Sequence, residues 1–291
     1  MERVTESLKH LALPLIFVVL YGSGFVGAKL GLPHAGPFSF LALRFGLAAS
    51  VMLLIALAIK APWPKTWGEA LHIACAGLLG VGTFSLGAYM SIERGVSPAI
   101  SALIVALNPI LVAIAAGPLL GEKTNKGQFI GLMLGLAGVY LVLHDRLAID
   151  PAYLAATSLS VLALLGLAAG NLYQKKKCSS MNLFTGGAIQ TLACTIAMCV
   201  GLLLSNEKPI QWEPEFVVAW LWTGLAISIG AVSILYLMIR RAEVSRVASV
   251  FFLMPVSAAV LAYLLFGQTI GTTAMVGIGI TALGVFLAQK R

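Results

Sequence analysis

The feature that most constrains this chain is a repeat of its first half within its second. The segment SPAISALIVALNPILVAIAAGPLLGEK, which begins at Ser97, returns as SRVASVFFLMPVSAAVLAYLLFGQ from Ser245. Aligning Pro109 with Pro255 gives a shift of 255 − 109 = 146 in a chain of 291 residues. The same shift pairs Gly121 with Gly267, Gly131 with Gly277, Gly138 with Gly284, Gly24 with Gly170, and Lys29 with Lys175. The repeat predicts two equivalent halves, residues 1–145 and 146–291.

The composition predicts an integral membrane protein. Hydrophobic residues make up 59% of the chain and charged residues 10%, and the mean hydropathy is +0.97. A water-soluble fold of this length cannot bury that much apolar surface. The apolar runs are about 20 residues long, enough for a helix to cross about 30 Å of hydrocarbon. They are continuous and do not alternate, which excludes membrane-spanning β-strands.

The apolar runs and the breaks between them predict an all-α fold of ten transmembrane helices. Proline and glycine clusters, such as Pro33-His34-Ala35-Gly36-Pro37, mark the breaks. The spans are expected at Leu11–Leu30, Pro37–Ile59, Trp67–Ile92, Pro98–Leu120, Lys126–Leu143, Pro151–Gln174, Leu183–Leu204, Glu215–Ile239, Val247–Phe266 and Thr269–Ala288. The first run belongs to the repeat, so we expect an uncleaved span there and not a signal peptide.

The basic residues predict the orientation of the chain. Most of them fall in loops on the side of the N-terminus: Arg3, Lys9, Lys60, Lys65, Lys123, Lys126, Lys175, Lys176, Lys177, Arg240, Arg241, Arg246, Lys290 and Arg291. Because cytoplasmic loops are enriched in Lys and Arg, both termini are expected in the cytoplasm of a multi-pass inner-membrane protein. This signal accounts for the net charge of +8, so no nucleic-acid partner is expected. Five spans in each half leave the second half inverted relative to the first, as in many secondary transporters around a central cavity.

Two equivalent prolines interrupt the fourth and ninth spans. Pro109 and Pro255 each remove a helix hydrogen bond to a carbonyl about four residues back. Such a carbonyl needs protein or water as a partner, so a proline at this depth indicates a kink beside a cavity. Both prolines are predicted to be hinges. The alternative is a kink that serves packing alone.

Ionisable side chains are scarce within the spans, where they usually mark a pathway. The middle thirds of the predicted spans contain no Asp or Glu, and Arg44 is the deepest charge. Two interpretations of Arg44 stay open. It is either a structural cation, bonded to helix carbonyls or paired with Glu93, or a group that binds a carboxylate.

Catalytic and metal chemistry are not expected. His10, His34, His72 and His144 lie near span ends, and Cys75, Cys178, Cys194 and Cys199 form no C-x-x-C pair. We therefore expect no metal and no cofactor. Gly22-Ser23-Gly24 resembles the serine motif of intramembrane proteases. No histidine at that depth is available to activate the serine, so we predict that the chain is not an enzyme.

The other notable side chains near the middle of the predicted spans are aromatic or weakly polar. They predict an amphipathic, uncharged binding pocket. The candidate substrate-binding residues are Tyr21, Ser23, Phe84, Ser85, Tyr89, Asn108, Asn171, Trp222, Ser228, Ser233, Tyr236 and Phe252, with Tyr173 at the same depth. For each of them the alternative is packing between helices or a place at the membrane interface.

These segments together resemble the ten-helix, EamA-type transporters of the drug/metabolite transporter superfamily. The resemblance is carried by Tyr21-Gly22-Ser23-Gly24-Phe25 with Lys29, by Ala42-Leu43-Arg44-Phe45, by Asn108-Pro109 leading to Gly121-Glu122-Lys123, and by Gly135-x-x-Gly138-Val139. It implies two five-helix bundles around a cavity lined by spans 1, 3, 4, 6, 8 and 9, and export of small metabolites. Within the family the chain is most similar to amino-acid exporters of the YddG type.

The sequence therefore predicts an exporter of aromatic and other neutral amino acids and related metabolites. Alternating access or facilitated diffusion would carry the solute. A multidrug or nucleotide-sugar carrier is the first alternative, and a non-transporting membrane enzyme or scaffold the second. The expected partners are the small-molecule substrate and the lipid bilayer. A monomer is expected, with a dimer through Gly131-x-x-x-Gly135 as the alternative.

Overall fold

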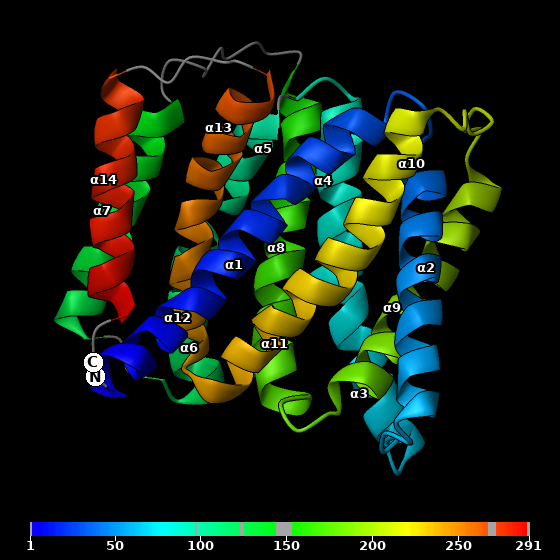
Figure 1. Ribbon diagram of the computed structural model, residues 1–291, viewed down its shortest axis with the longest axis horizontal. Helices are drawn as coiled ribbons and strands as arrows, with labels where there is room; N and C mark the ends of the chain where they lie inside the picture. Colours follow the sequence, from blue (N-terminus) through cyan, green and yellow to red (C-terminus); the bar gives the residue numbers. More distant parts are fainter. Residues whose placement is uncertain (1, 97, 123–124, 144–152, 267–271, 290–291) are drawn as a thin grey trace.

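A computed structural model describes residues 2–96, 98–122, 125–143, 153–266 and 272–289, and these residues form helices and connecting turns without strands (Figure 1). The first half contains α1 (Glu2–Gly31), α2 (Pro37–Ala58), α3 (Trp67–Gly77), the π-helical η1 (Leu78–Thr83), α4 (Phe84–Glu93), α5 (Pro98–Val105), α6 (Asn108–Leu120) and α7 (Lys126–Leu143). The second half contains α8 (Tyr153–Lys177), α9 (Leu183–Leu204), α10 (Pro214–Leu221), the π-helical η3 (Trp222–Ala231), α11 (Val232–Arg241), α12 (Val244–Ser249), the 3₁₀-helical η4 (Val250–Phe252), α13 (Leu253–Phe266) and α14 (Thr272–Gln289).

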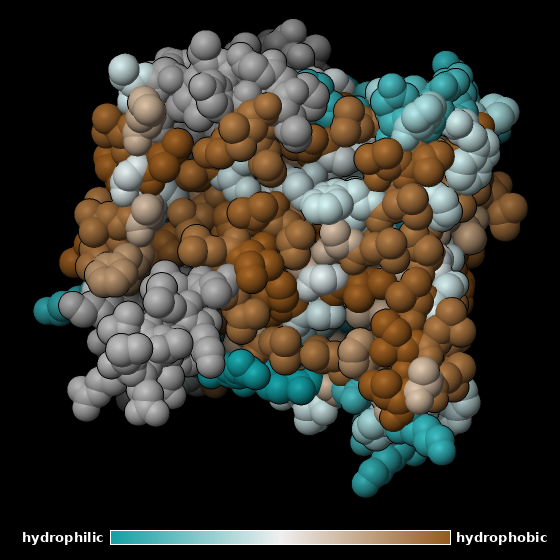
Figure 2. All heavy atoms as spheres, viewed as in Figure 1, coloured by the Kyte–Doolittle hydropathy of each residue, from teal (hydrophilic) through white to brown (hydrophobic). Residues whose placement is uncertain are grey.

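Several helical segments are long and apolar enough to cross a membrane. Six of them within the described residues have both the length and the composition: Leu13–Gly31, Pro37–Ala58, Trp67–Glu93, Ala155–Lys177, Leu183–Leu204 and Pro214–Arg241. Asn108–Leu120, Val244–Ser257 and Met275–Ala288 are shorter apolar helices. Hydrophobic side chains cover most of the band between the two ends of the molecule, and hydrophilic ones gather at its edges (Figure 2).

The helix boundaries recur at the spacing seen in the sequence. The limits of α2 and α9 differ by 146 residues at both ends, and so do those of α7 and α14. A π-helical segment interrupts the third span at η1 and the corresponding span at η3. In each of them a hydroxyl donates to the carbonyl five residues back, from Thr83 to Leu78 and from Ser228 to Thr223. These two spans, predicted as uniform helices, therefore carry an irregular turn that the sequence did not reveal.

The spans that contain the paired prolines are divided. The fourth span, predicted as one helix, ends at Val105 and begins again at Asn108, so Pro109 lies in the first turn of α6. In the second half the 3₁₀ turn of η4 precedes α13, whose first turn contains Pro255. A proline is tolerated there because the first turn of a helix needs no donor from it. Each span is thus interrupted a few residues before its proline, at the place where a kink was expected.

The equivalent helices α7 and α14 pack against each other in opposite directions, and glycines bring their backbones together (Figure 1). A methyl group added to Gly138 would lie 2.5 Å from the backbone nitrogen of Thr281, and one added to Gly284 would lie 2.5 Å from that of Gly135. Gly131 likewise faces Gly284 and Ala288. The Gly131-x-x-x-Gly135 face is therefore occupied within the chain and is not free to form a dimer.

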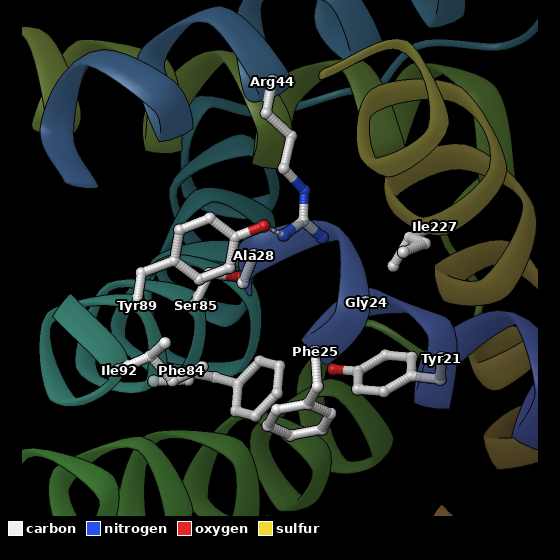
Figure 3. Close-up of a pocket in the computed structure, with 11 residues that line it drawn as sticks. Tyr21, Gly24, Phe25, Ala28, Arg44, Phe84, Ser85, Tyr89, Ile92 and Ile227 are labelled. Atoms are coloured by element: carbon white, nitrogen blue, oxygen red, sulfur yellow. Dashed lines mark hydrogen bonds between the residues drawn. The ribbon is translucent and has the colours of Figure 1, made fainter. Parts of the chain in front are cut away.

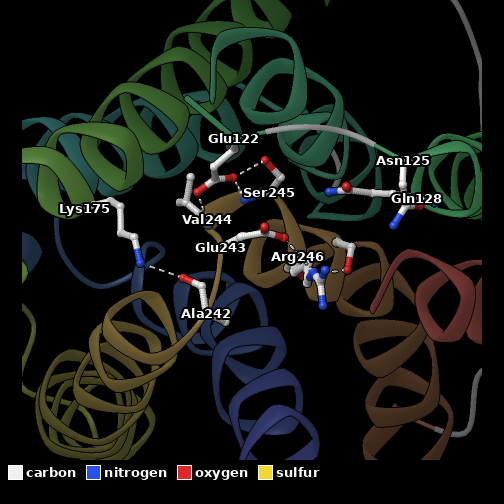
Figure 4. Close-up of polar contacts among 10 residues, drawn as sticks. Glu122, Asn125, Gln128, Lys175, Ala242, Glu243, Val244, Ser245 and Arg246 are labelled. Carbon is white, nitrogen blue, oxygen red and sulfur yellow. Dashed lines mark hydrogen bonds and ion pairs between the residues drawn. The ribbon is translucent and has the colours of Figure 1, made fainter. Parts of the chain in front are cut away.

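Two glutamates connect the halves by binding the starts of α2 and α12, and these helix starts lie at opposite ends of the molecule (Figure 1). The Glu207 carboxylate accepts from the backbone nitrogens of Phe38 and Ser39, both at 2.8 Å, at the start of α2. The Glu122 carboxylate accepts from the backbone nitrogens of Val244 and Ser245, at 2.8 and 3.2 Å, at the start of α12 (Figure 4). Both serine hydroxyls also donate to these carboxylates at 2.6 Å. Each carboxylate thus satisfies helix N–H groups that would otherwise lack partners.

We predict that Gly284→Leu destabilises the folded protein by about 1–3 kcal/mol, because the side chain would collide with the backbone of α7. Gly279→Leu on the same helix is the matched control, since nothing lies within 4 Å of a methyl group added there. Thermal unfolding of the detergent-solubilised variants measures both effects. Equal melting temperatures for the two variants would contradict the close α7–α14 contact.

Candidate functional site

A pocket lies between α1, α2, α4 and η3, where helices of both halves meet (Figure 3). It is lined by Tyr21, Gly24, Phe25, Ala28, Arg44, Phe84, Ser85, Ala88, Tyr89, Ile92 and Ile227. These side chains come together because the α1 and α4 residues recur at helical spacing, as in Tyr21 and Phe25 or Ser85 and Tyr89. The pocket is therefore a product of helix faces and not of loops.

Arg44 is the charged side chain among the residues that line this pocket, and it is 5% exposed. Its Nε donates to the Ser228 hydroxyl at 2.9 Å, and its Nη1 donates to the Tyr89 hydroxyl at 3.1 Å. The guanidinium also lies over the rings of Phe45 and Tyr89, at 5.4 and 5.8 Å from their centroids. Arg44 thus connects α2 with α4 and η3 and presents its charge to the pocket.

No carboxylate lies within ion-pair distance of Arg44 in the described part of the chain. Arg44 is therefore not paired with Glu93, and its two hydrogen-bond partners are side-chain hydroxyls and not helix carbonyls. A guanidinium removed from water without a counter-charge is unfavourable. The hydrogen bonds to Ser228 and Tyr89 are those of a structural cation, and the binding of a solute carboxylate by Arg44 stays a prediction.

The Ser85 hydroxyl is another polar group of the pocket, and unlike Arg44 it lacks a hydrogen-bond partner. The residue is 2% exposed, and its Oγ makes no hydrogen bond to any described residue. Buried hydroxyls are normally paired, so an unpaired one beside a pocket points to water or a ligand as its partner.

Aromatic rings form the opposite side of the pocket from the guanidinium (Figure 3). The rings of Tyr21 and Phe84 stack with their centroids 5.6 Å apart, and Phe25 lies beside them. Tyr21 is also in contact with Phe17 and Phe251, with centroids 5.1 and 5.7 Å away. The packed rings give the pocket a rigid apolar wall.

The pocket is narrow in this conformation. Its free volume is about 20 Å³, room for about one water molecule. A larger cavity of about 430 Å³ lies at the loop end of the neighbouring helices, lined by residues 32–38 and 205–211 apart from Ile210, together with Met90 and Glu93. We call this larger cavity the vestibule. Helix α4 lines both spaces, with Met90 and Glu93 at the vestibule and Tyr89 and Ile92 at the pocket.

The EamA-like transporter family matches this chain twice, over residues 8–144 and 154–289. The chain belongs to this family. The two matched stretches together cover nearly all of the chain. EamA-like transporters belong to the drug/metabolite transporter superfamily, as the sequence resemblance implied.

Relatives of this EamA-like protein are known in bacteria and among solved structures. YedA of Escherichia coli, an uncharacterized inner membrane transporter, is 25% identical over 92% of this chain and 87% of its own. A probable amino-acid metabolite efflux pump of Salmonella typhimurium is 23% identical over 94% of this chain and 93% of its own. A crystal structure superposes with a TM-score of 0.80 at 16% identity and covers 95% of both chains, which shows a shared fold.

The structure brings together some of the residues predicted to bind substrate. Tyr21, Phe84, Ser85 and Tyr89 line the pocket, and Ser228 reaches it through its hydrogen bond with Arg44. Sequence reasoning missed Phe25, Ala28, Ile92 and Ile227 as pocket residues, because apolar side chains in apolar spans carry no distinguishing signal. Phe25 follows Tyr21 by one helical turn, and that spacing is the signal which could have identified it.

The other predicted site residues lie away from this pocket. Ser23 accepts a hydrogen bond from Trp222 Nε1 at 2.8 Å, and Trp222 is 45% exposed. The Tyr173 hydroxyl lies 2.7 Å from Nδ1 of His72. Phe252 packs against Gly135 of α7, and Tyr236 is part of the hydrophobic core. Asn171 is buried on α8 and Ser233 is half-buried on α11.

Two further sequence expectations concern metals and thiols. No group of three His, Cys, Asp or Glu residues within the described ranges could hold a metal ion. The four cysteines are free, with Cys194 buried and Cys199 exposed. Burial raises the pKa of the Cys178 thiol, just beyond the end of α8, to about 11, so it stays protonated at neutral pH.

Asn108 is fully buried at the start of α6, and neither its Oδ1 nor its Nδ2 has a partner among the described residues. We predict that Asn108→Leu, of similar volume, raises the free energy of unfolding by about 1 kcal/mol or more, because it removes two unsatisfied polar atoms. Gln190→Met is the matched control and should lower stability, since Gln190 Nε2 donates to Gln174 Oε1 at 2.9 Å. Thermal unfolding in detergent measures both variants. A destabilised Asn108→Leu variant would contradict the claim that the Asn108 amide lacks hydrogen-bond partners.

Proposed function

We propose that this EamA-like transporter exports amino acids with neutral, apolar or aromatic side chains, and related small metabolites, from the cytoplasm. The observation that carries the proposal is the pocket itself. It combines a buried guanidinium and an unpaired hydroxyl with an aromatic wall, between helices of the two halves. Such a pocket matches a solute that has one polar and one apolar end.

The arrangement of two halves is compatible with alternating access, in which the pocket opens in turn to each side of the membrane. We propose that residues 1–145 and 146–291 form inverted five-helix repeats, and that ten spans place both termini in the cytoplasm. The antiparallel contact of the equivalent helices α7 and α14 supports this arrangement. The helix breaks before Pro109 and Pro255 are proposed as hinges that widen the narrow pocket to admit a solute.

The vestibule gives the solute an exit on the side opposite the proposed cytoplasmic face. It extends from the end of α4 to the loops around Pro33 and Glu207. The designation of the Salmonella typhimurium relative as a probable amino-acid metabolite efflux pump supports this direction and this class of solute. We propose an inner-membrane location, as described for the relative YedA, and a monomeric transporter.

Other carriers of this superfamily fit the pocket less well. A nucleotide sugar carries two phosphate charges, whereas Arg44 is the single cation among the described residues that line the pocket. Hydrophobic cations, a common class of drugs, would meet the positive charge of that same guanidinium. Competition by either class of compound would identify these alternatives, and chemical change of the solute would identify an enzyme.

We predict that proteoliposomes containing the protein take up labelled phenylalanine, threonine and methionine faster than protein-free vesicles. Failure of all three amino acids would refute the proposed substrate class.

Phe84→Ala should lower the rate of phenylalanine uptake about tenfold, because the ring stacks on Tyr21 in the pocket. Phe286→Ala is the matched control and should leave the rate unchanged, since Phe286 is 61% exposed on α14.

A further inference from the structure

We infer that the pocket selects a carboxylate monoanion that carries an apolar group, and that it does not require the ammonium group of an amino acid. This inference rests on the proposed transport function and specifies its substrate class. Deaminated acids, such as 3-phenylpropanoate, are then bound at least as tightly as phenylalanine.

The first step is the charge of the pocket. Among the described residues that line it, Arg44 is charged and none is an Asp or a Glu. The ion pair between described residues is Arg246 with Glu243, on α12 and the residue before it. The faces of Phe45 and Tyr89 provide a partial negative potential and not a counter-charge. The buried cation is therefore complemented by an anionic ligand.

The second step is the geometry of the polar end. Nε and Nη1 of Arg44 are engaged by Ser228 and Tyr89, whereas Nη2 donates to no described residue. The Ser85 hydroxyl, also unpartnered, lines the same pocket on α4 (Figure 3). One carboxylate has two oxygens, which matches a free guanidinium N–H on one side and a hydroxyl donor on the other.

The third step is the position of the apolar end. Figure 3 shows the rings of Tyr21, Phe25 and Phe84 across the pocket from the Arg44 guanidinium. A ligand with its carboxylate at Arg44 therefore places its side group against the rings. An aromatic or branched apolar group fits that wall, and a second charged group does not.

The fourth step concerns the ammonium group. Glu93 and Glu207, two acidic residues at that end of the molecule, line the vestibule and not the pocket. An amino acid must strip water from its ammonium group to enter the pocket, and no opposite charge compensates this cost. An acid that lacks the ammonium group avoids the cost and keeps the contact with Arg44.

The test is competition against labelled phenylalanine uptake in proteoliposomes at neutral pH, together with calorimetric titration of the solubilised protein. 3-Phenylpropanoate and phenethylamine share a ring and a two-carbon chain and differ in their charged group. We expect 3-phenylpropanoate to compete and bind at least as well as phenylalanine, and about thirtyfold or more better than phenethylamine. Equal binding of the two compounds, or tighter binding of phenethylamine, overturns the inference.

Variants of the two polar groups separate recognition from a structural role. Arg44→Lys keeps the charge but loses the planar fork, and we expect it to weaken 3-phenylpropanoate binding about tenfold while leaving phenethylamine unaffected. A merely structural Arg44 would change both ligands together. Ser85→Ala removes an unpaired hydroxyl, so it should fold normally and still weaken 3-phenylpropanoate binding about tenfold. If Arg44→Lys does not fold, the Ser85→Ala result decides whether the pocket recognises the carboxylate.

Ser257→Ala is the matched control for Ser85→Ala. Ser257 is also buried with an unpartnered Oγ, but it faces Gly22 and is not among the pocket residues, so its replacement should leave binding unchanged.

The proposed amino-acid transport and the inferred carboxylate selectivity fail in different ways. Binding of 3-phenylpropanoate without phenylalanine uptake refutes amino-acid transport and supports this inference. Phenylalanine uptake without preference for the carboxylate supports transport and overturns the inference.

Discussion

Close backbone contact between helices of opposite direction holds the two halves of this protein together. In lipid, helices gain little from burying apolar side chains, so their association depends on van der Waals contact and on hydrogen bonds between them. Glycines allow that contact between α7 and α14, where Gly138 meets Thr281, and again where Gly80 of η1 meets Gly170 of α8. These two contacts join the halves at different places.

The pocket in turn depends on irregular turns within long helices. Ser228 lies in the π-helical η3, where its hydroxyl donates to the Thr223 carbonyl and accepts from Arg44 Nε. A regular helix would pair backbone groups four residues apart and would place this side chain in a different direction. The irregular turn therefore helps to orient a guanidinium that crosses from α2. Tyr89 on α4 accepts a hydrogen bond from its other side, so two helices together hold the cation in place.

The sequence predicted the spans better than the site. The predicted limits of Leu183–Leu204 and Lys126–Leu143 agree with α9 and α7, because apolar runs bounded by prolines, glycines and charges translate directly into helix ends. The pocket was predicted in part, since buried aromatic and hydroxyl side chains stand out in apolar spans. The partners of Arg44 were not predictable, because Ser228 lies 184 positions away in the chain. The π-helical turns were equally hidden, since their residues are ordinary for a membrane helix.

The glutamates at the two ends of the molecule have a consequence for the membrane. Glu207 and Glu122 fasten different helices, so loss of one set of hydrogen bonds does not weaken the other. In the alternating exchange proposed above, one end would open while the opposite end stays shut, so no continuous water column would form through the protein. Under that proposed cycle, protons and sodium ions would not leak along the solute's route, and the cell would keep its electrochemical gradients while the carrier works.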